Sequence, residues 1–273
     1  MKTLINLKIL IFSCLCMTTC YRGHSQESLL RVLAVEKLAE SPAMCCFSSS
    51  FAGFHFRNDF GMKEMMFAEL SAVWFRNKNA LLATVNHYGY ANYGDMQLTV
   101  GYGRNFGDRF AMTARIFYLM AHARGYPVRH SLSTDFSMAC KVSPKLYFDA
   151  TVYNPFMMRY GVVGQEVIPM RFSVGCSYLP VPKLLMALSV AKTLPGAWEV
   201  DCSFLTQPIP PLLLAASCSN TRLGVFIGLI YRKFLISVAA AWHYRISVSP
   251  QIGGVCYWED KRMRGWEDGR MGG

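Results

Sequence analysis

The stretch Met96–Tyr118, MQLTVGYGRNFGDRFAMTARIFY, sets the pattern for most of the chain. Apolar residues alternate with small or polar ones on both sides of Gly107-Asp108, a dipeptide typical of tight turns. Alternation with a period of two predicts two β-strands that each have one apolar face. The hairpin therefore predicts a sheet whose apolar face is covered either by the core of a soluble protein or by lipid.

The same pattern continues from Phe51 to Trp258 as a series of alternating runs separated by turn residues. One face of nearly every run is apolar, and the other is small, polar or occasionally charged. The predicted strands are Phe51–Arg57, Phe67–Arg76, Ala80–Tyr90, Met96–Phe106, Arg109–Ala121, Leu132–Val142, Leu146–Asn154, Met170–Tyr178, Leu184–Lys192, Trp198–Leu205, Leu212–Ser219, Leu223–Tyr231, Phe234–Tyr244 and Gln251–Trp258. The sequence therefore predicts an all-β protein with about fourteen strands.

Composition favours lipid as the cover of the apolar face. Hydrophobic residues make up 52% of the 273 residues, and charged residues make up only 16%. The longest apolar candidate for a membrane helix beyond the N-terminus, Leu223–Trp242, is interrupted by Arg232-Lys233. Runs of about ten residues with aromatics near their ends are typical of tilted transmembrane strands. We therefore predict a closed antiparallel transmembrane β-barrel, with a soluble β-sandwich as the alternative.

The N-terminus has the features of a secretory signal. Lys2 and Lys8 precede a short apolar stretch, and Gly23-His24-Ser25 predicts cleavage before Gln26. A lipoprotein signal ending at Cys20 is the alternative. An exported barrel of this kind is expected in the outer membrane of a bacterium, in contact with its lipid.

Four segments follow from these patterns. Residues 1–25 are the signal peptide, residues 26–50 an N-terminal segment, residues 51–258 the barrel and residues 259–273 a disordered polar tail. Glu27–Ala39 has apolar residues at helical spacing. This helix is expected either to plug the lumen or to cross the periplasmic mouth of the barrel.

Several functional classes lack support in the sequence. The net charge of +11 comes without a basic stripe or an aromatic-basic module, so nucleic acid is not an expected partner. There are no CxxC or paired Cys/His spacings and no catalytic motif, so we expect no metal, no cofactor and no enzymatic activity. Of the seven cysteines that follow the signal, most share the apolar phase of a strand and are expected to be small hydrophobic residues, with a disulfide framework as the alternative.

Charged residues on the polar phase predict a cluster inside the barrel. In an antiparallel hairpin, residues at equal distances in sequence from the turn lie opposite each other. Counting in this way from the turns places Arg115 beside Asp135 and Asp149 beside Arg171. It also places Asp135 and Asp149 at a similar height on adjacent strands. Glu199 and Asp201 extend the same polar wall. Alternating charges on adjacent strands support pairing. The cluster is interpreted either as a structural ladder or as a constriction that selects solutes by charge.

The chain resembles a known family at several points. The relevant stretches are HSQ (24–26), SPA (41–43), FGMKEMMFAELSAVW (60–74), HYGYANYGDMQLTVGYGRNFGDRFAMTARIFY (87–118), SPKLYFDATVYNPF (143–156) and WHYRISVSPQIGGVCYW (242–258). They resemble outer-membrane β-barrels of Bacteroidota in the fatty-acid-transporter-like superfamily, which includes the shuttle-type barrel of type IX secretion. The resemblance implies a fourteen-stranded barrel. Two features depart from the family pattern: Ser-Pro-Ala replaces Asn-Pro-Ala, and fifteen residues follow the aromatic pair Tyr257-Trp258.

Two functions follow from the resemblance and the pattern together. The first is a transport or channel barrel for small or hydrophobic solutes, with the N-terminal segment controlling the lumen. The second is a non-transporting barrel that docks secretion or surface-assembly proteins. A continuous lumen or a lateral opening would favour the first function, and a blocked lumen with long ordered loops would favour the second.

Overall fold

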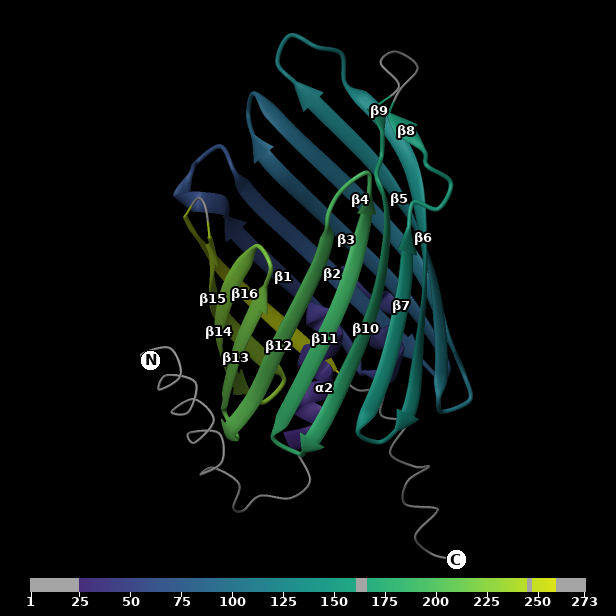
Figure 1. Cartoon of the computed structure of the whole chain (residues 1–273), viewed down its shortest axis with the longest axis vertical. Helices are drawn as coiled ribbons and strands as arrows, with labels where there is room; N and C mark the ends of the chain where they lie inside the picture. Colours follow the sequence, from purple (N-terminus) through teal and green to yellow (C-terminus); the bar gives the residue numbers. More distant parts are fainter. Residues whose placement is uncertain (1–24, 161–165, 245–246, 259–273) are drawn as a thin grey trace, which may run out of the picture.

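The protein is a single closed β-barrel, shown in Figure 1. The structure is a computed structural model that describes residues 25–160, 166–244 and 247–258. Fourteen antiparallel strands follow one another around the ring, and the first strand, β1, pairs with the last, β16. The fold class predicted from the alternation is therefore confirmed. Residues 1–24 of the predicted signal peptide and the predicted polar tail lie outside the described residues, whereas Ser25 is the first residue of the helix α2.

The strands match the predicted runs to within a few residues at each end. They are β1 (Ser50–Asn58), β2 (Met66–Arg76), β3 (Asn79–Tyr90), β4 (Tyr93–Phe106), β5 (Phe110–Ala123), β6 (Arg129–Ser143), β7 (Leu146–Tyr153), β10 (Met170–Val181), β11 (Leu184–Leu194), β12 (Trp198–Ile209), β13 (Leu212–Ser219), β14 (Arg222–Tyr231), β15 (Phe234–His243) and β16 (Val248–Trp258). Two further strands, β8 (Arg159–Tyr160) and β9 (Glu166–Val167), form a separate hairpin in a segment expected to be a loop.

The apolar phase of the strands points away from the lumen. Val100 on β4 lies directly opposite Ile116 on β5, and these side chains are 59% and 60% exposed. Thr99 and Arg115, on the other phase, are only 1% and 5% exposed. Large apolar side chains are exposed in the same way on strands around the ring. A continuous exposed apolar band of this kind needs lipid as its solvent, which argues against a soluble sandwich.

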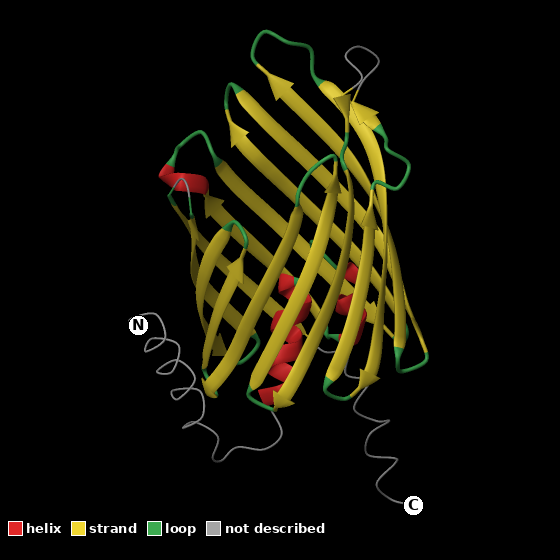
Figure 2. Cartoon of the chain, in the orientation of Figure 1, coloured by secondary structure: helices red, strands yellow, loops and turns green. Residues whose placement is uncertain are grey.

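The two ends of the barrel differ, as Figure 2 shows. Short turns join the strands at the end where β1 starts and β16 finishes, for example Gly107–Arg109 between β4 and β5. The opposite end carries the longer connections, including the segment that holds β8 and β9. We call these the turn end and the loop end. Among the described residues, no helix has the length and hydropathy needed to cross a bilayer.

The N-terminal segment lies inside the barrel, in the half nearer the turn end (Figure 2). It consists of the helix α2 (Ser25–Glu36) and the 3-10 helix η1 (Pro42–Phe47). The spacing of Leu29, Val32 and Leu33 places these side chains on one helical face, and all three are buried. This face packs in one apolar cluster with inward-facing wall residues such as Leu213. We call residues 25–47 the plug.

Candidate functional site in the barrel lumen

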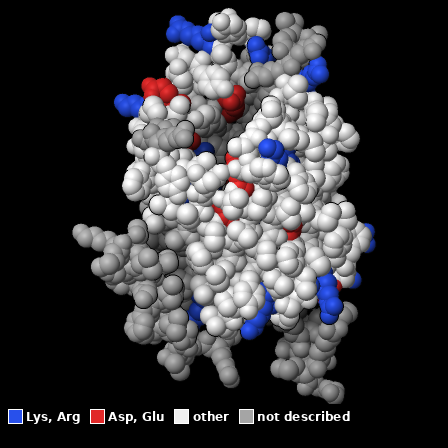
Figure 3. Space-filling model, in the orientation of Figure 1, with Lys and Arg blue, Asp and Glu red and all other residues white. Residues whose placement is uncertain are grey.

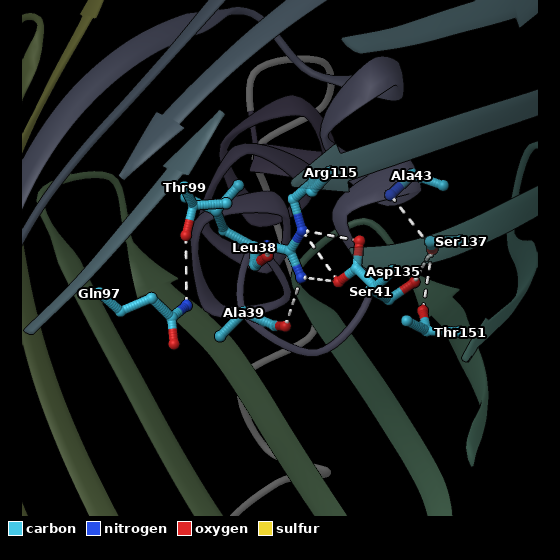
Figure 4. Close-up of polar contacts among 10 residues, drawn as sticks. All are labelled: Leu38, Ala39, Ser41, Ala43, Gln97, Thr99, Arg115, Asp135, Ser137 and Thr151. Carbon is cyan, nitrogen blue, oxygen red and sulfur yellow. Dashed lines mark hydrogen bonds and ion pairs between the residues drawn. The ribbon is translucent and has the colours of Figure 1, made fainter. Parts of the chain in front are cut away.

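Arg115 on β5 joins the barrel wall to the plug, as Figure 4 shows. Its Nε donates to both carboxylate oxygens of Asp135 on β6, at 3.1 and 3.0 Å. Its Nη1 donates to the backbone carbonyl of Leu38 at 2.7 Å, and its Nη2 to that of Ala39 at 3.0 Å. Both charged side chains are almost fully buried. The guanidinium is therefore neutralised by the wall and held by backbone carbonyls of the plug, which satisfies a group that is costly to bury alone.

A second set of hydrogen bonds holds the plug to the same side of the wall. The hydroxyl of Ser137 on β6 accepts from the backbone N–H of Ala43 at 3.4 Å and from the hydroxyl of Thr151 on β7 at 2.9 Å. The amide nitrogen of Asn105 on β4 donates to the carbonyl of Cys46 at 2.8 Å. We call Arg115, Asp135, Ser137, Thr151 and Asn105 the latch. Its members all lie on β4, β5, β6 and β7.

The structure brings together only part of the polar cluster expected from the sequence. Arg115 lies directly opposite Asp135, on the same face of the sheet. Asp149, however, lies opposite Ala139 and Gly175. The expected contacts of Asp149 with Asp135 and with Arg171 are therefore wrong. The partner of Asp149 on β6 is four residues after Asp135, and its partner on β10 is four residues after Arg171.

The remaining members of the expected cluster lie on β10 and β12, which follow β7 in the ring. Arg171 on β10 forms an ion pair with Glu199 on β12, at 2.9 Å between Nη1 and Oε2. Both of these side chains are more than one-third exposed, so the pair is solvated. Asp201, two residues along β12, lines a cavity beside the plug. The six predicted residues thus form one buried pair, one exposed pair and two separate carboxylates.

Two cavities touch the turn between α2 and η1, and they lie against different parts of the wall. The larger, of about 230 Å³, is bordered by β11 to β16 and by Glu36, Lys37 and Glu40 of this turn. Asp201 and Arg222 also line it. Its lining combines charged and hydroxyl groups with apolar side chains that range from alanines to Leu205 and Phe226. Figure 3 shows a hollow below the loop end, with acidic and basic atoms visible at its edge.

The smaller cavity, of about 130 Å³, lies on the latch side. It is bordered by Leu38, Ala39 and Arg115, and by the rings of Phe117 and Tyr153, which meet edge to face with centroids 5.1 Å apart. Arg115 therefore borders this cavity while its guanidinium pairs with Asp135. Movement of the turn at residues 37–40 would change both cavities together.

Several of these residues were not identified from the sequence. Ser137, Thr151 and Asn105 are ordinary members of the polar phase, and nothing in their spacing distinguishes them. The carbonyls of Leu38 and Ala39 carry no sequence signal at all, because any residue supplies a carbonyl. The one available signal was the unusual placement of an arginine and an aspartate on the lumen phase of adjacent strands.

The cysteines show no sign of a disulfide or metal site. All seven described cysteines are free thiols. Cys45 and Cys46 are buried in the plug, and burial raises the pKa of the Cys46 thiol to about 12 and also raises that of Cys45. Both thiols therefore stay protonated near neutral pH. Within the described ranges, no group of three or more His, Cys, Asp or Glu side chains is arranged to hold a metal ion.

The fold and the lumen define a class, that of barrels resembling solved outer-membrane channels. The toluene transporter TodX of P. putida matches 82% of this chain and 94% of its own, with a TM-score of 0.65 and 7% sequence identity. The monoaromatic hydrocarbon channel CymD matches 82% of this chain and 93% of its own, with a TM-score of 0.57 and 7% identity.

A FadL homologue from Pseudomonas aeruginosa is also similar, with 80% of this chain and 91% of its own covered, a TM-score of 0.57 and 7% identity. Identities this low establish a shared fold and leave function open. No family model matches the sequence, and no curated protein matches it either. The barrel fold expected from the sequence is thus shared with these solved channels.

Proposed function

We propose that the protein is an outer-membrane channel or transporter for small solutes with an apolar part, and that the plug controls passage through it. The observation that carries the proposal is the pair of cavities on the two sides of the turn at residues 37–40, inside a closed barrel. The solved barrels named for toluene and monoaromatic hydrocarbons support an apolar component of the solute.

The membrane orientation follows from the ends of the barrel. Barrels of bacterial outer membranes have short turns on the periplasmic side and longer loops outside. The turn end is therefore assigned to the periplasm and the loop end to the cell surface. This places the plug on the periplasmic side of the lumen, where it blocks the exit for a solute that enters from outside.

The latch gives the plug a reversible attachment. Its contacts are hydrogen bonds and one ion pair rather than covalent bonds, and they connect the plug to β4, β5, β6 and β7. On the opposite side, the charged cavity separates the turn at residues 37–40 from parts of β11 to β16. Release of the latch would leave the plug held mainly by apolar packing.

The alternative of a non-transporting partner barrel was expected to show a blocked lumen and long ordered loops. The plug blocks the lumen near the turn end, but several described loop-end connections are very short, such as residues 91–92 and 220–221. Proteins of type IX-like secretion or surface assembly therefore gain no specific support as partners. An enzymatic role was not expected, and this stays a prediction.

The test is single-channel recording of the refolded full chain in planar bilayers, with Arg115→Gln beside the wild type. A channel with a plug should show a low conductance that rises severalfold, with more frequent openings, when the latch loses its guanidinium. The matched control is Arg124→Gln, an exposed position at the loop end. Wild type and Arg115→Gln that both insert and remain silent would contradict the proposal and favour the partner-barrel alternative.

A further inference from the structure

The turn end of the barrel is strongly basic. Among its described strand ends and turns, Asp108 is the one acidic residue, and no ion pair forms there. Lys141 is on the lumen phase, with its ammonium 5.8 Å from the centre of the buried Tyr147 ring. The other basic residues on these strand ends and turns are Arg76, Lys78, Arg104, Arg109, Lys145, Lys183, Arg232 and Lys233. They are spread over most of the circumference. An annulus of anionic groups would match this distribution, whereas one protein partner would cover only part of it.

One part of this ring has the geometry of a site. Arg76 at the end of β2 lies directly opposite Asn79 on β3, and Asn79 lies directly opposite Arg104 on β4. All three side chains are exposed on the outward phase. Two strand spacings separate the backbones of the two arginines by about 10 Å. Two flexible guanidinium groups can therefore converge on one anion in front of Asn79.

The amide of Asn79 is oriented for the same purpose. The hydroxyl of Tyr102 donates to its Oδ1 at 2.6 Å, so its amide N–H groups are directed to another acceptor. Lys78, in the turn between β2 and β3, is exposed and adds a further positive charge. The four groups supply donors and no carboxylate, which is the donor set that a phosphate requires.

The neighbouring side chains place this site at the edge of the apolar band. Trp74, on the same phase as Arg76, is 50% exposed, and Tyr102 is 48% exposed. Tryptophan and tyrosine favour the interface between hydrocarbon and headgroups, and arginine and lysine extend from there towards the headgroups. The anion is therefore expected at headgroup depth. A soluble anion or a protein surface would not need the aromatic flank.

We propose that Arg76, Lys78, Asn79 and Arg104 bind the phosphodiester headgroup of an anionic phospholipid in the periplasmic leaflet. The inference rests on the membrane location and orientation in the proposed function. Basic residues near a membrane surface attract anionic lipid by about 1 kcal/mol each, which is about fivefold in affinity. The site would fix the depth and tilt of this side of the barrel.

The experiment is native mass spectrometry of the folded full chain in detergent, titrated with phosphatidylglycerol or phosphatidylcholine of identical acyl chains. Wild type should bind its first phosphatidylglycerol at least tenfold more tightly than phosphatidylcholine. The double variant Arg76→Gln/Arg104→Gln should weaken the first phosphatidylglycerol by at least tenfold. Asn79→Ala, which removes the oriented amide and leaves all charges, should weaken it by a few fold.

The matched control is Arg109→Gln/Lys145→Gln, which removes two charges from the same ring outside the site. It should change the first dissociation constant by less than twofold. Equal losses in both double variants would overturn the site, as would equal affinity of the wild type for the two lipids. Displacement of the lipid by millimolar inorganic phosphate, or tighter binding of an acidic peptide, would overturn the assignment to a lipid.

Failure of this inference is distinguishable from failure of the proposed function. A protein that inserts and conducts but shows no phosphatidylglycerol preference contradicts only the lipid site. A folded chain that enters no bilayer contradicts the membrane location, on which both depend. Before the titration, folding of each variant is checked on a gel, where a folded barrel should migrate differently before and after heating.

Discussion

Arg115 and Asp135 lie directly opposite each other on β5 and β6, and the Nε of Arg115 donates to both oxygens of the carboxylate at 3.1 and 3.0 Å. Nη1 donates to the carbonyl of Leu38, and Nη2 donates both to Oδ2 of Asp135 and to the carbonyl of Ala39. A single buried ion pair thus belongs both to the wall and to the contact with the plug. Changes in either member should alter barrel stability and plug position together.

Asp135→Asn should be strongly destabilising. The substitution leaves the Arg115 guanidinium buried without a counter-charge, and breaking one partner of a buried pair costs about 3–5 kcal/mol. Urea unfolding of the refolded protein in vesicles, followed by tryptophan fluorescence, measures the loss. Arg171→Gln is the matched control, because its pair with Glu199 is exposed and worth at most about 1 kcal/mol. Equal losses in the two variants would refute the buried latch.

Gly103→Cys should lock the plug. A Cβ built at Gly103 on β4 lies 2.7 Å from the Sγ of Cys46 and 2.6 Å from the Cγ2 of Thr113. Once the Thr113 side chain shifts, the new thiol lies within reach of Cys46 for a disulfide. Mild oxidation should therefore hold the plug in place and suppress the openings caused by Arg115→Gln in the double variant. Reductant should restore the openings.

Two controls accompany this experiment. Gly103→Ser introduces a similar side chain without a thiol and should respond to neither oxidant nor reductant. Cys46→Ser in the Gly103→Cys background removes the partner of the disulfide. Oxidation that blocks conductance in either control would mean that the plug is not the element being locked.

The barrel could be predicted from the sequence because its physical cause is repeated in every strand. Lipid on one side and a filled lumen on the other impose the same alternation around the whole ring. The pairing of Arg115 with Asp135 also followed, because a short loop joins β5 to β6 and fixes the register by reflection. Reflection was sufficient for this hairpin, but it failed for β6 and β7, whose short turn pairs Asp149 with Ala139 and not with Asp135.

The sequence did not predict the position of Asp149 relative to Arg171, because the connection from β7 to β10 is long. It contains the β8–β9 hairpin, so the pairing register of β7 with β10 cannot be counted from a single turn. The inward packing of the plug was also left open. Helical spacing shows that α2 has an apolar face, but it does not show which wall residues cover that face.

Asp201→Asn should lower any preference of the channel for cations. The larger cavity is lined by the carboxylates of Glu36, Glu40 and Asp201 against the positive charges of Lys37 and Arg222. Burial raises the pKa of Glu36 to about 7, so one full negative charge remains in excess only above that pH, for example at pH 8. A wide solvated site of this kind gives weak selectivity. The reversal potential under a salt gradient should move by several millivolts towards zero. Glu64→Gln, at an exposed loop-end position, should leave it unchanged.

Alkaline pH should loosen the plug. Burial raises the pKa of Cys46 to about 12 and also raises that of Cys45, whereas an exposed thiol titrates near 8.5. The docked plug therefore holds protons that the undocked plug releases, so docking is unaffected below about pH 8.5 and weakens as the pH rises above it. Each thiol changes the docking equilibrium by up to about tenfold per pH unit in this range.

Maleimide labelling of the two thiols, measured by mass spectrometry after peptide mapping, tests this prediction. Its rate should increase with pH by more than thiolate formation alone would give. The conductance of the wild type should also rise between pH 8.5 and pH 11, and the double variant Cys45→Ala/Cys46→Ala should not show this rise. An equal rise in the double variant would assign the effect to groups outside the plug.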